Sequence, residues 1–226
     1  MSRIFFLLNN LEEFNFGHLI NRYLNSYYVD IGVSMPNSPP DYKLIILWNY
    51  NKIIADLPKQ KNVILFHSSD LPKGRGWAPI YYSIFENEPE HYISGIFAEK
   101  NVDSGDIIIK ASFPLSEDYT ADDLRRFDME ISIRMVEMIL KRFESREIRG
   151  AKQKGLSTYR KRRRSEDNLV DLNQRLIDII PHLRACEVSS PAFFDLNGTR
   201  YNLKLIPQNS AQFPTNIAIA FGEDIT

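Results

Sequence analysis

A histidine followed by a glycine-containing loop is the segment of this sequence best suited to chemistry. It spans residues 66–79 and reads FHSSDLPKGRGWAP. His67 could exchange protons near neutral pH, as imidazole side chains do, and Gly74 and Gly76 would let the backbone approach a ligand closely. A histidine at a strand end more often makes a structural hydrogen bond, but the loop chemistry beside it favours a functional role.

Three further side chains of this loop could contact a substrate. Lys73 and Arg75 can hold phosphate or carboxylate oxygens. Trp77 offers an aromatic surface on which a flat group could stack. We interpret the three as candidate contacts for an anionic substrate such as a diphosphate.

A second segment, residues 98–107, reads AEKNVDSGDI and contains a carboxylate in a turn. Asp103, Ser104 and Gly105 are ordinary turn residues that need no function. A helical and a strand-like stretch separate them from His67, however, and that spacing can return the chain to the same sheet edge. A carboxylate close to a histidine can orient and charge-stabilise the imidazole.

The elements that must position these residues begin with short apolar runs. Residues 4–8, 28–33, 44–48 and 63–66 are rich in β-branched or aromatic side chains, which is typical of strands buried on both faces of a helix-covered parallel sheet. Apolar residues from Leu11 to Leu24 recur at helical spacing. These patterns predict an α/β fold whose ligand site lies at the carboxyl ends of the strands.

The remaining elements follow in chain order. Residues 79–85 read as a helix, residues 92–97 and 107–111 as two strands, and a long helix follows Thr120, with Asp123 completing a box-like start. The pattern divides the chain into three segments. Residues 1–150 would form a Rossmann-like core, residues 151–167 a basic connector, and residues 168–226 a small α+β appendage. The appendage would contain a helix over 168–185 and a hairpin of strands 192–196 and 201–206 around Asn197-Gly198.

Composition excludes several classes of protein. The chain has 28 Lys+Arg against 29 Asp+Glu and is 43% hydrophobic, which is typical of a soluble globular protein without general affinity for nucleic acid or anionic lipid. Cys186 is the single cysteine, so no internal disulfide can form, and no Cys/His spacing suggests a metal site. Because the run at residues 4–8 is too short for a bilayer span or a signal peptide, we expect a cytoplasmic protein with no membrane partner.

The two chemical segments together resemble the folate-dependent formyltransferase family. The family pattern is Asn-x-His-x-Ser-x-Leu-Pro, a nearby Arg-Gly and Pro, and then Asp-x-Gly-x-Ile. Leu65 stands where the family has its asparagine, which is a departure in the catalytic motif. The matching residues are His67, Ser69, Leu71, Pro72, Arg75, Gly76, Pro79, Asp103, Gly105 and Ile107.

The resemblance implies 10-formyltetrahydrofolate as the formyl donor and no metal. It makes His67 and Asp103 the catalytic pair. The implied folate-binding residues are Asn51, Lys52, Ile53, Ile54, Ala98, Val102 and Asp103. The candidate substrate-binding residues are Ser69, Lys73, Arg75 and Trp77, of which the last three are chosen for their chemistry.

A second resemblance concerns the acceptor. Residues 159–168, together with the hairpin region after them, are similar to the corresponding part of formyltransferases that act on nucleotide-linked amino sugars. Gly74 to Trp77 resembles the loop of the pseudaminic-acid-pathway branch. The implied acceptor is the amine of a nucleotide-linked amino-dideoxy sugar, used for surface glycans such as lipopolysaccharide O-antigen. Whether the chain forms a homodimer is left open.

Two alternative functions stay open. Methionyl-tRNA formyltransferases share the core motif, but residues 151–226 are too few for the larger C-terminal barrel that those enzymes carry. A non-catalytic relative could instead bind nucleic acid through Arg160 to Arg164. Glu166 and Asp167 follow this basic run directly, so we favour a solvated or internally paired connector over a phosphate-binding or nucleic-acid-binding run.

Overall fold

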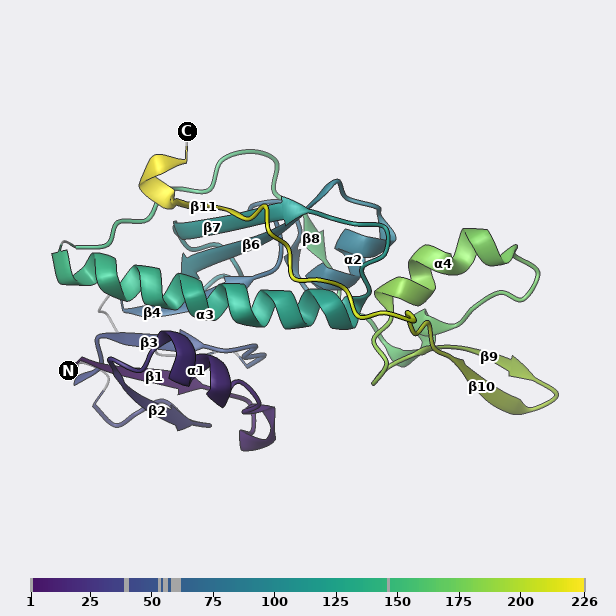
Figure 1. Ribbon diagram of the computed structural model, residues 1–226, viewed down its shortest axis with the longest axis horizontal. Helices are drawn as coiled ribbons and strands as arrows, with labels where there is room; N and C mark the ends of the chain where they lie inside the picture. Colours follow the sequence, from purple (N-terminus) through teal and green to yellow (C-terminus); the bar gives the residue numbers. More distant parts are fainter. Residues whose placement is uncertain are drawn as a thin grey trace.

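The computed structural model describes residues 2–38, 41–52, 54, 57, 62–145 and 147–225 and contains a mixed sheet packed against α-helices (Figure 1). The sheet has seven strands in the order β11-β7-β6-β4-β3-β1-β2. Strands β1 to β4 pair in parallel and β7 points the same way, whereas β6 and β11 run in the opposite direction. The predicted α/β fold with a mostly parallel sheet is confirmed. The strands are β1 (Arg3–Leu7), β2 (Tyr28–Gly32), β3 (Leu44–Leu47), β4 (Val63–His67), β6 (Glu90–Phe97), β7 (Ile107–Pro114) and β11 (Ala218–Phe221).

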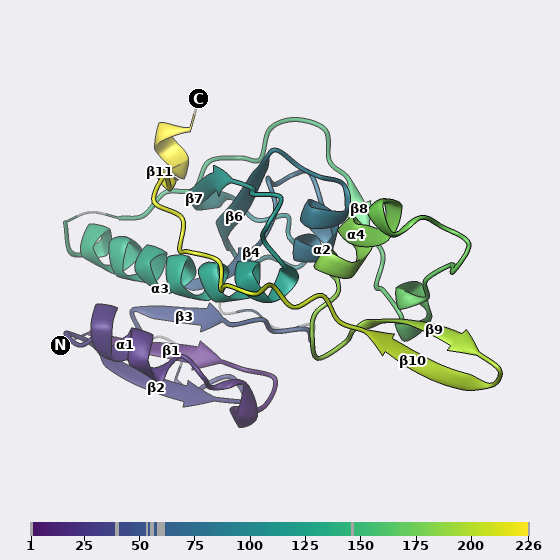
Figure 2. The same ribbon diagram turned by 45° about the vertical axis from the view of Figure 1, so that its right-hand side comes forward.

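The two faces of the parallel strands are covered differently. Helices α1 (Gly17–Tyr23) and α3 (Ala121–Ser145) lie on one face (Figures 1 and 2). Ile4 and Phe6 of β1 pack in the same core as these helices, whereas the alternate residue Phe5 packs in a second apolar cluster with residues from loops. Loops therefore cover the face on which the candidate chemistry lies.

The long helix α3 begins as the sequence predicts. The hydroxyl of Thr120 accepts a hydrogen bond from the Asp123 backbone at 3.3 Å, and the Asp123 carboxylate accepts from the Thr120 backbone at 3.1 Å. This reciprocal capping satisfies two backbone donors that the helix itself cannot pair. Helix α1 is shorter than predicted, because a 3-10 turn over Leu11–Glu13, capped by the side chain of Asn10, precedes it.

Helix α4 (Leu176–Ala185) lies beside α2 (Pro79–Phe85), and the hairpin that follows α4 extends to one side of the sheet (Figure 2). The predicted start of α4 at residue 168 is wrong. The Val170 N–H donates to the Phe193 carbonyl at 2.7 Å, which holds this stretch extended.

The predicted hairpin forms between β9 (Ala192–Leu196) and β10 (Thr199–Leu203). Its turn residues Asn197 and Gly198 have φ values of 51° and 78°, the left-handed conformations that Asn-Gly turns favour. The second strand lies earlier than predicted, because the tight turn pairs Thr199 directly with Leu196. After the hairpin the chain returns to the sheet, where β11 pairs with β7. Within the described residues, no helix combines the length and apolarity that a membrane crossing requires.

Cys186, at the end of α4, provides a test of local burial. Burial raises the pKa of its thiol to about 11. The thiol of the unfolded chain ionises near its ordinary pKa of 9.0, whereas the native thiol stays neutral up to about pH 11. The free energy of unfolding therefore falls as the pH rises from 9.0 toward 11. We expect an aromatic disulfide reagent at pH 8 to label Cys186 more slowly in the native protein than in urea. Equal labelling rates would contradict this assignment.

Candidate active site

His67 lies at the carboxyl end of β4 and is 7% exposed. Its Nε2 is 2.8 Å from the Gly74 carbonyl oxygen, a contact in which Nε2–H donates. Its Nδ1 is 3.5 Å from Oδ2 of Asp103. The two predicted catalytic side chains therefore lie together, although they are far apart in sequence.

Asp103 is held in a conformation that points its carboxylate at this histidine. Its φ is 50°, and Oδ2 accepts a hydrogen bond from the Gly76 N–H at 2.8 Å. A Cβ at Gly105 would lie 1.8 Å from the Phe97 carbonyl oxygen, so only glycine fits this close approach. The Asp-x-Gly spacing thus sets the turn, and the turn places a buried carboxylate where it can stabilise a protonated imidazole.

Gln153 is a site residue that the sequence analysis missed. Its side-chain Nε2 donates to the carbonyls of Asp103 and Gly105, at 2.8 Å each. Its Oε1 accepts from the Arg75 guanidinium, at 2.6 Å from Nη2. Gln153 therefore joins the turn of Asp103 to the loop after His67. A polar residue in a predicted connector gives no local signal of this role.

The connector also builds one wall of the site. Strand β5 (Arg75–Gly76) pairs in parallel with β8 (Tyr159–Arg160). Beside this pair, the Gly74 N–H donates to the hydroxyl of Thr158 at 2.7 Å. These bonds fix the backbone of the segment whose carbonyl contacts His67.

Leu65 occupies the position of the family asparagine. It lies on β4 opposite Ile96 and next to Leu47, and it packs against both apolar clusters on this face of the sheet. Its side chain has no hydrogen-bond donor to offer a developing oxyanion.

The predicted folate-binding residues fall into two groups. Ile54 and Ala98 pack in the apolar cluster of Phe5 on the loop-covered face. Lys52 and Val102 are exposed, and the Asn51 backbone donates to the Asn9 side chain at 3.0 Å. Ile53 lies outside the described residues. The structure thus brings Ile54 and Ala98 into one apolar cluster, with Ala98 hydrogen-bonded to Val63 at the start of β4.

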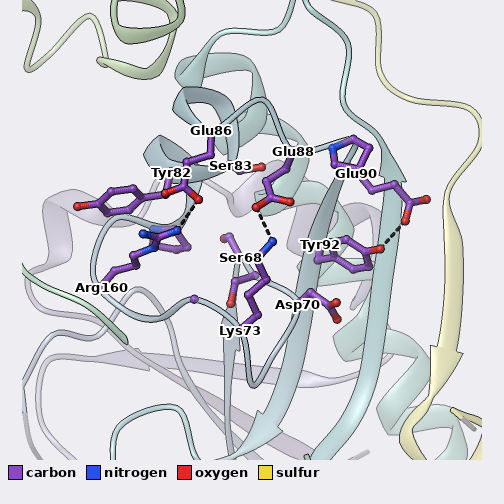
Figure 3. Close-up of a pocket in the computed structure, with 14 residues that line it drawn as sticks. Ser68, Asp70, Lys73, Tyr82, Ser83, Glu86, Glu88, Glu90, Tyr92 and Arg160 are labelled. Carbon is purple, nitrogen blue, oxygen red and sulfur yellow. Dashed lines mark hydrogen bonds and ion pairs between the residues drawn. The ribbon is translucent and has the colours of Figure 1, made fainter. Parts of the chain in front are cut away.

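A cavity of about 240 Å³ borders the same loop (Figure 3). Ser69 and Lys73 line it, as does Gly74, whose carbonyl contacts His67. Arg75 and Trp77 lie elsewhere, with Arg75 bound to Gln153 and the ring of Trp77 under Arg162 at 4.7 Å. The cavity lining is Ser68, Ser69, Asp70, Lys73, Gly74, Pro79, Tyr82, Ser83, Glu86, Glu88, Pro89, Glu90, Tyr92 and Arg160.

Charged groups in this cavity are paired with one another. Lys73 is 2.5 Å from Glu88, and Arg160 forms an ion pair with Glu86. Tyr92 donates its hydroxyl proton to Glu90, and this hydrogen bond raises the pKa of the phenol. The dashed contacts in Figure 3 show these pairs around the opening. Such a lining offers hydroxyl and carboxylate groups rather than a surplus of cations.

The basic run is engaged inside the molecule, as the sequence analysis favoured. Arg160 contacts Glu86 and lies over the ring of Tyr82. Arg163 lies over Tyr81 and donates to the Asn168 side chain at 2.6 Å. For these arginines, the prediction of internal pairing is confirmed. Among the residues that the structure describes, no group of three or more His, Cys, Asp or Glu could hold a metal ion.

Sequence comparison finds relatives over most of this chain, although no protein-family model matches it. The methionyl-tRNA formyltransferase of Fusobacterium nucleatum is 33% identical over 165 residues, which cover 69% of this chain and 52% of that protein. The corresponding protein of Protochlamydia amoebophila is 29% identical over 180 residues, 76% of this chain and 56% of that protein. The chain thus spans about half the length of these curated relatives.

Solved structures extend the likeness to nearly the whole chain. A methionyl-tRNA formyltransferase from Clostridium thermocellum superposes with a TM-score of 0.70 at 19% identity and covers 98% of this chain and 100% of that one. The chain has the formyltransferase fold. The predicted fold family is therefore confirmed, and the sequence relatives support the folate-dependent formyltransferase family.

Two further structures with this fold contain ligands. HypX from Aquifex aeolicus, in complex with tetrahydrofolic acid, superposes with a TM-score of 0.74 at 17% identity, covering 91% of this chain and 37% of HypX. WlaRD, a sugar 3N-formyltransferase, was solved in the presence of dTDP and 5-N-formyl-tetrahydrofolate. It superposes with a TM-score of 0.65 at 16% identity, covering 88% of this chain and 84% of WlaRD. The fold thus occurs in proteins with tRNA and sugar acceptors, and the pseudaminic-acid branch stays a prediction.

Proposed function

We propose that this protein is an N-formyltransferase that moves the formyl group of 10-formyltetrahydrofolate to the amine of a nucleotide-linked amino-dideoxy sugar. The observation that carries the proposal is the buried pair of His67 and Asp103 at the carboxyl end of β4, 3.5 Å apart, within the formyltransferase fold. Ligands of open α/β folds bind at this end of the strands.

The reaction needs a hydrogen-bond donor and a route for one proton. The neutral amine attacks the formyl carbon, the carbonyl oxygen becomes negative, and the carbon–nitrogen bond to the folate then breaks. The amine loses a proton and the leaving folate nitrogen gains one. The Nε2–H of His67, which the Gly74 carbonyl accepts in this structure, is the donor that could serve the oxyanion, and Asp103 stabilises the ring when it is charged.

We expect the folate to bind against the apolar face that includes Ile54 and Ala98. The folate complexes of two proteins with this fold support this placement. Calorimetry with 5-formyltetrahydrofolate, a stable analogue, should detect binding, and Ala98→Arg should abolish it because the new side chain puts a charge into the apolar slot. Leu196→Ala, on the exposed hairpin, is the matched control. No heat from the wild type at millimolar ligand would contradict the folate assignment.

The size and chemistry of the cavity support a small polyhydroxylated acceptor. About 240 Å³ is below the usual range of roughly 300 to 1,000 Å³ for drug-sized ligands. The space therefore suits a single sugar ring rather than a whole nucleotide. Purified protein should be incubated with 10-formyltetrahydrofolate and a panel of UDP- and dTDP-linked amino sugars. Mass spectrometry should then show one added formyl group, and no product across the panel would contradict the sugar acceptor.

Formylation of methionyl-tRNA is the second candidate, because the sequence relatives carry that name. Arg160 pairs with a carboxylate of this chain, and Arg162 and Arg163 lie over aromatic rings. These contacts leave the basic run less available for an RNA backbone. Filter binding of charged methionyl-tRNA at two salt concentrations separates the candidates, because binding through several phosphates weakens steeply with salt. Salt-dependent binding followed by formylation of the tRNA would favour the second candidate over the first.

A further inference from the structure

A buried chain of hydrogen bonds joins four separate elements beside the candidate active site. The hydroxyl of Ser83 on α2 is hydrogen-bonded to Nδ1 of His91 on β6 at 3.1 Å, and Nε2–H of His91 donates to Oδ1 of Asp128 on α3 at 2.8 Å. Oδ2 of the same carboxylate accepts from the hydroxyl of Ser68. A carboxylate can only accept, so Nε2–H of His91 and the hydroxyl of Ser68 are the two donors to Asp128.

Most groups of this network are buried. The side chain of His91 is fully buried, and Asp128 is 8% exposed. Buried polar groups must keep their partners, and a complete network in such surroundings fixes the relative position of every element that it touches. Neither residue has a part in the formyl-transfer steps derived for His67 and Asp103.

One end of the network reaches the residue directly after the candidate catalytic histidine. The imidazole of His67 lies against Gly74 and Asp103 on the loop-covered face. The hydroxyl of the next residue, Ser68, contacts α3 on the opposite face, as expected for successive residues of an extended chain. The backbone at the end of β4 is therefore held from both sides.

We propose that Asp128, acting through Ser68, is a positioning residue for formyl transfer. The proposal rests on the proposed function and adds a residue from α3 to its machinery. The bond to Ser68 fixes the peptide unit that carries His67, so that the imidazole keeps its orientation toward Asp103. Ser68 also borders the cavity, so the same bond holds one of the residues that line the cavity in place.

Ser68→Ala is the test variant, because it removes the link to His67 and leaves the bond between His91 and Asp128 intact. We expect kcat to fall about 10- to 100-fold, since small displacements of reacting groups are costly in the transition state. KM for both substrates should stay within about threefold of the wild type. Ser68→Thr keeps the hydroxyl and should restore kcat. Ser132→Ala, buried one turn further along α3, is the control for general loosening of the helix.

Two kinetic outcomes would overturn the proposal. An unchanged kcat with a lower melting temperature would make the bond purely structural. A raised acceptor KM with unchanged kcat would make Ser68 a substrate contact. If the wild type transfers no formyl group, the imidazole NMR signals of the ligand-free protein decide, with His67→Gln identifying the signal of His67. That signal should shift in Ser68→Ala and stay in place in Ser132→Ala, and an unchanged signal would overturn the positioning role independently of the reaction.

Discussion

Asp103→Asn is expected to lower formyl transfer by about 10²- to 10⁴-fold, the usual contribution of a general acid–base group, while the protein stays folded. The amide oxygen can still accept the hydrogen bond from Gly76. Asparagine also tolerates the left-handed conformation that Asp103 adopts, with φ of 50°. Only the negative charge beside His67 is lost. Steady-state kinetics with 10-formyltetrahydrofolate, together with a melting curve, measure the two parts of this expectation.

Asp106→Asn provides the matched control for this charge. Asp106 lies in the same segment, but its carboxylate pairs with Lys152 at 2.9 Å rather than with the histidine. Its neutralisation should leave kcat/KM within about threefold of the wild type. If Asp103→Asn kept more than about a tenth of the wild-type turnover, Asp103 would have no part in the mechanism.

The parts of the site that could be predicted from sequence are those encoded locally. β4 ends at His67 because an apolar run gives way to a polar loop. The turn of Asp103 follows from turn residues, and Gly105 is required by the close approach of Phe97. The helix that starts after Thr120 was also predictable, because its capping partners are three residues apart. In each of these cases, the interacting groups are close in the chain or required by a motif.

The parts that could not be predicted depend on contacts between distant segments. Gln153 and Asp128 carry no motif, and each acquires its role only when the fold brings it to the site. Strand β11 is a short edge strand whose residues are exposed or half-buried, and its place in the sheet depends on pairing with β7, which is distant in sequence. Val170 lies within the stretch predicted to be helical, yet its bond to Phe193 keeps it extended. Tertiary hydrogen bonds override local periodicity in this stretch.

Removal of the histidine side chain should have the largest effect of all. His67→Ala is expected to abolish measurable formyl transfer, because Leu65 has replaced the second donor that the family pattern places nearby. Loss of one oxyanion donor costs about 10²- to 10³-fold in other enzymes, so His67 carries a larger share of the barrier in this chain. His18→Ala, an exposed histidine on α1, is the control and should keep wild-type turnover.

Leu65→Asn should give no large gain, even though it recreates the family motif. Leu65 packs against two apolar clusters, and an amide placed there without a partner would cost about 1 to 3 kcal/mol of stability. The backbone N–H groups of Gly74, Arg75 and Gly76 already donate to Thr158 and Asp103, so His67 is left to serve the oxyanion without amide donors from this loop. Rapid-quench assays of the wild type, His67→Ala and Leu65→Asn measure this division of roles. A wild type that binds folate and sugar nucleotide without forming product, combined with turnover restored by Leu65→Asn, would instead show that the natural chain is a binding protein whose catalytic donor was lost.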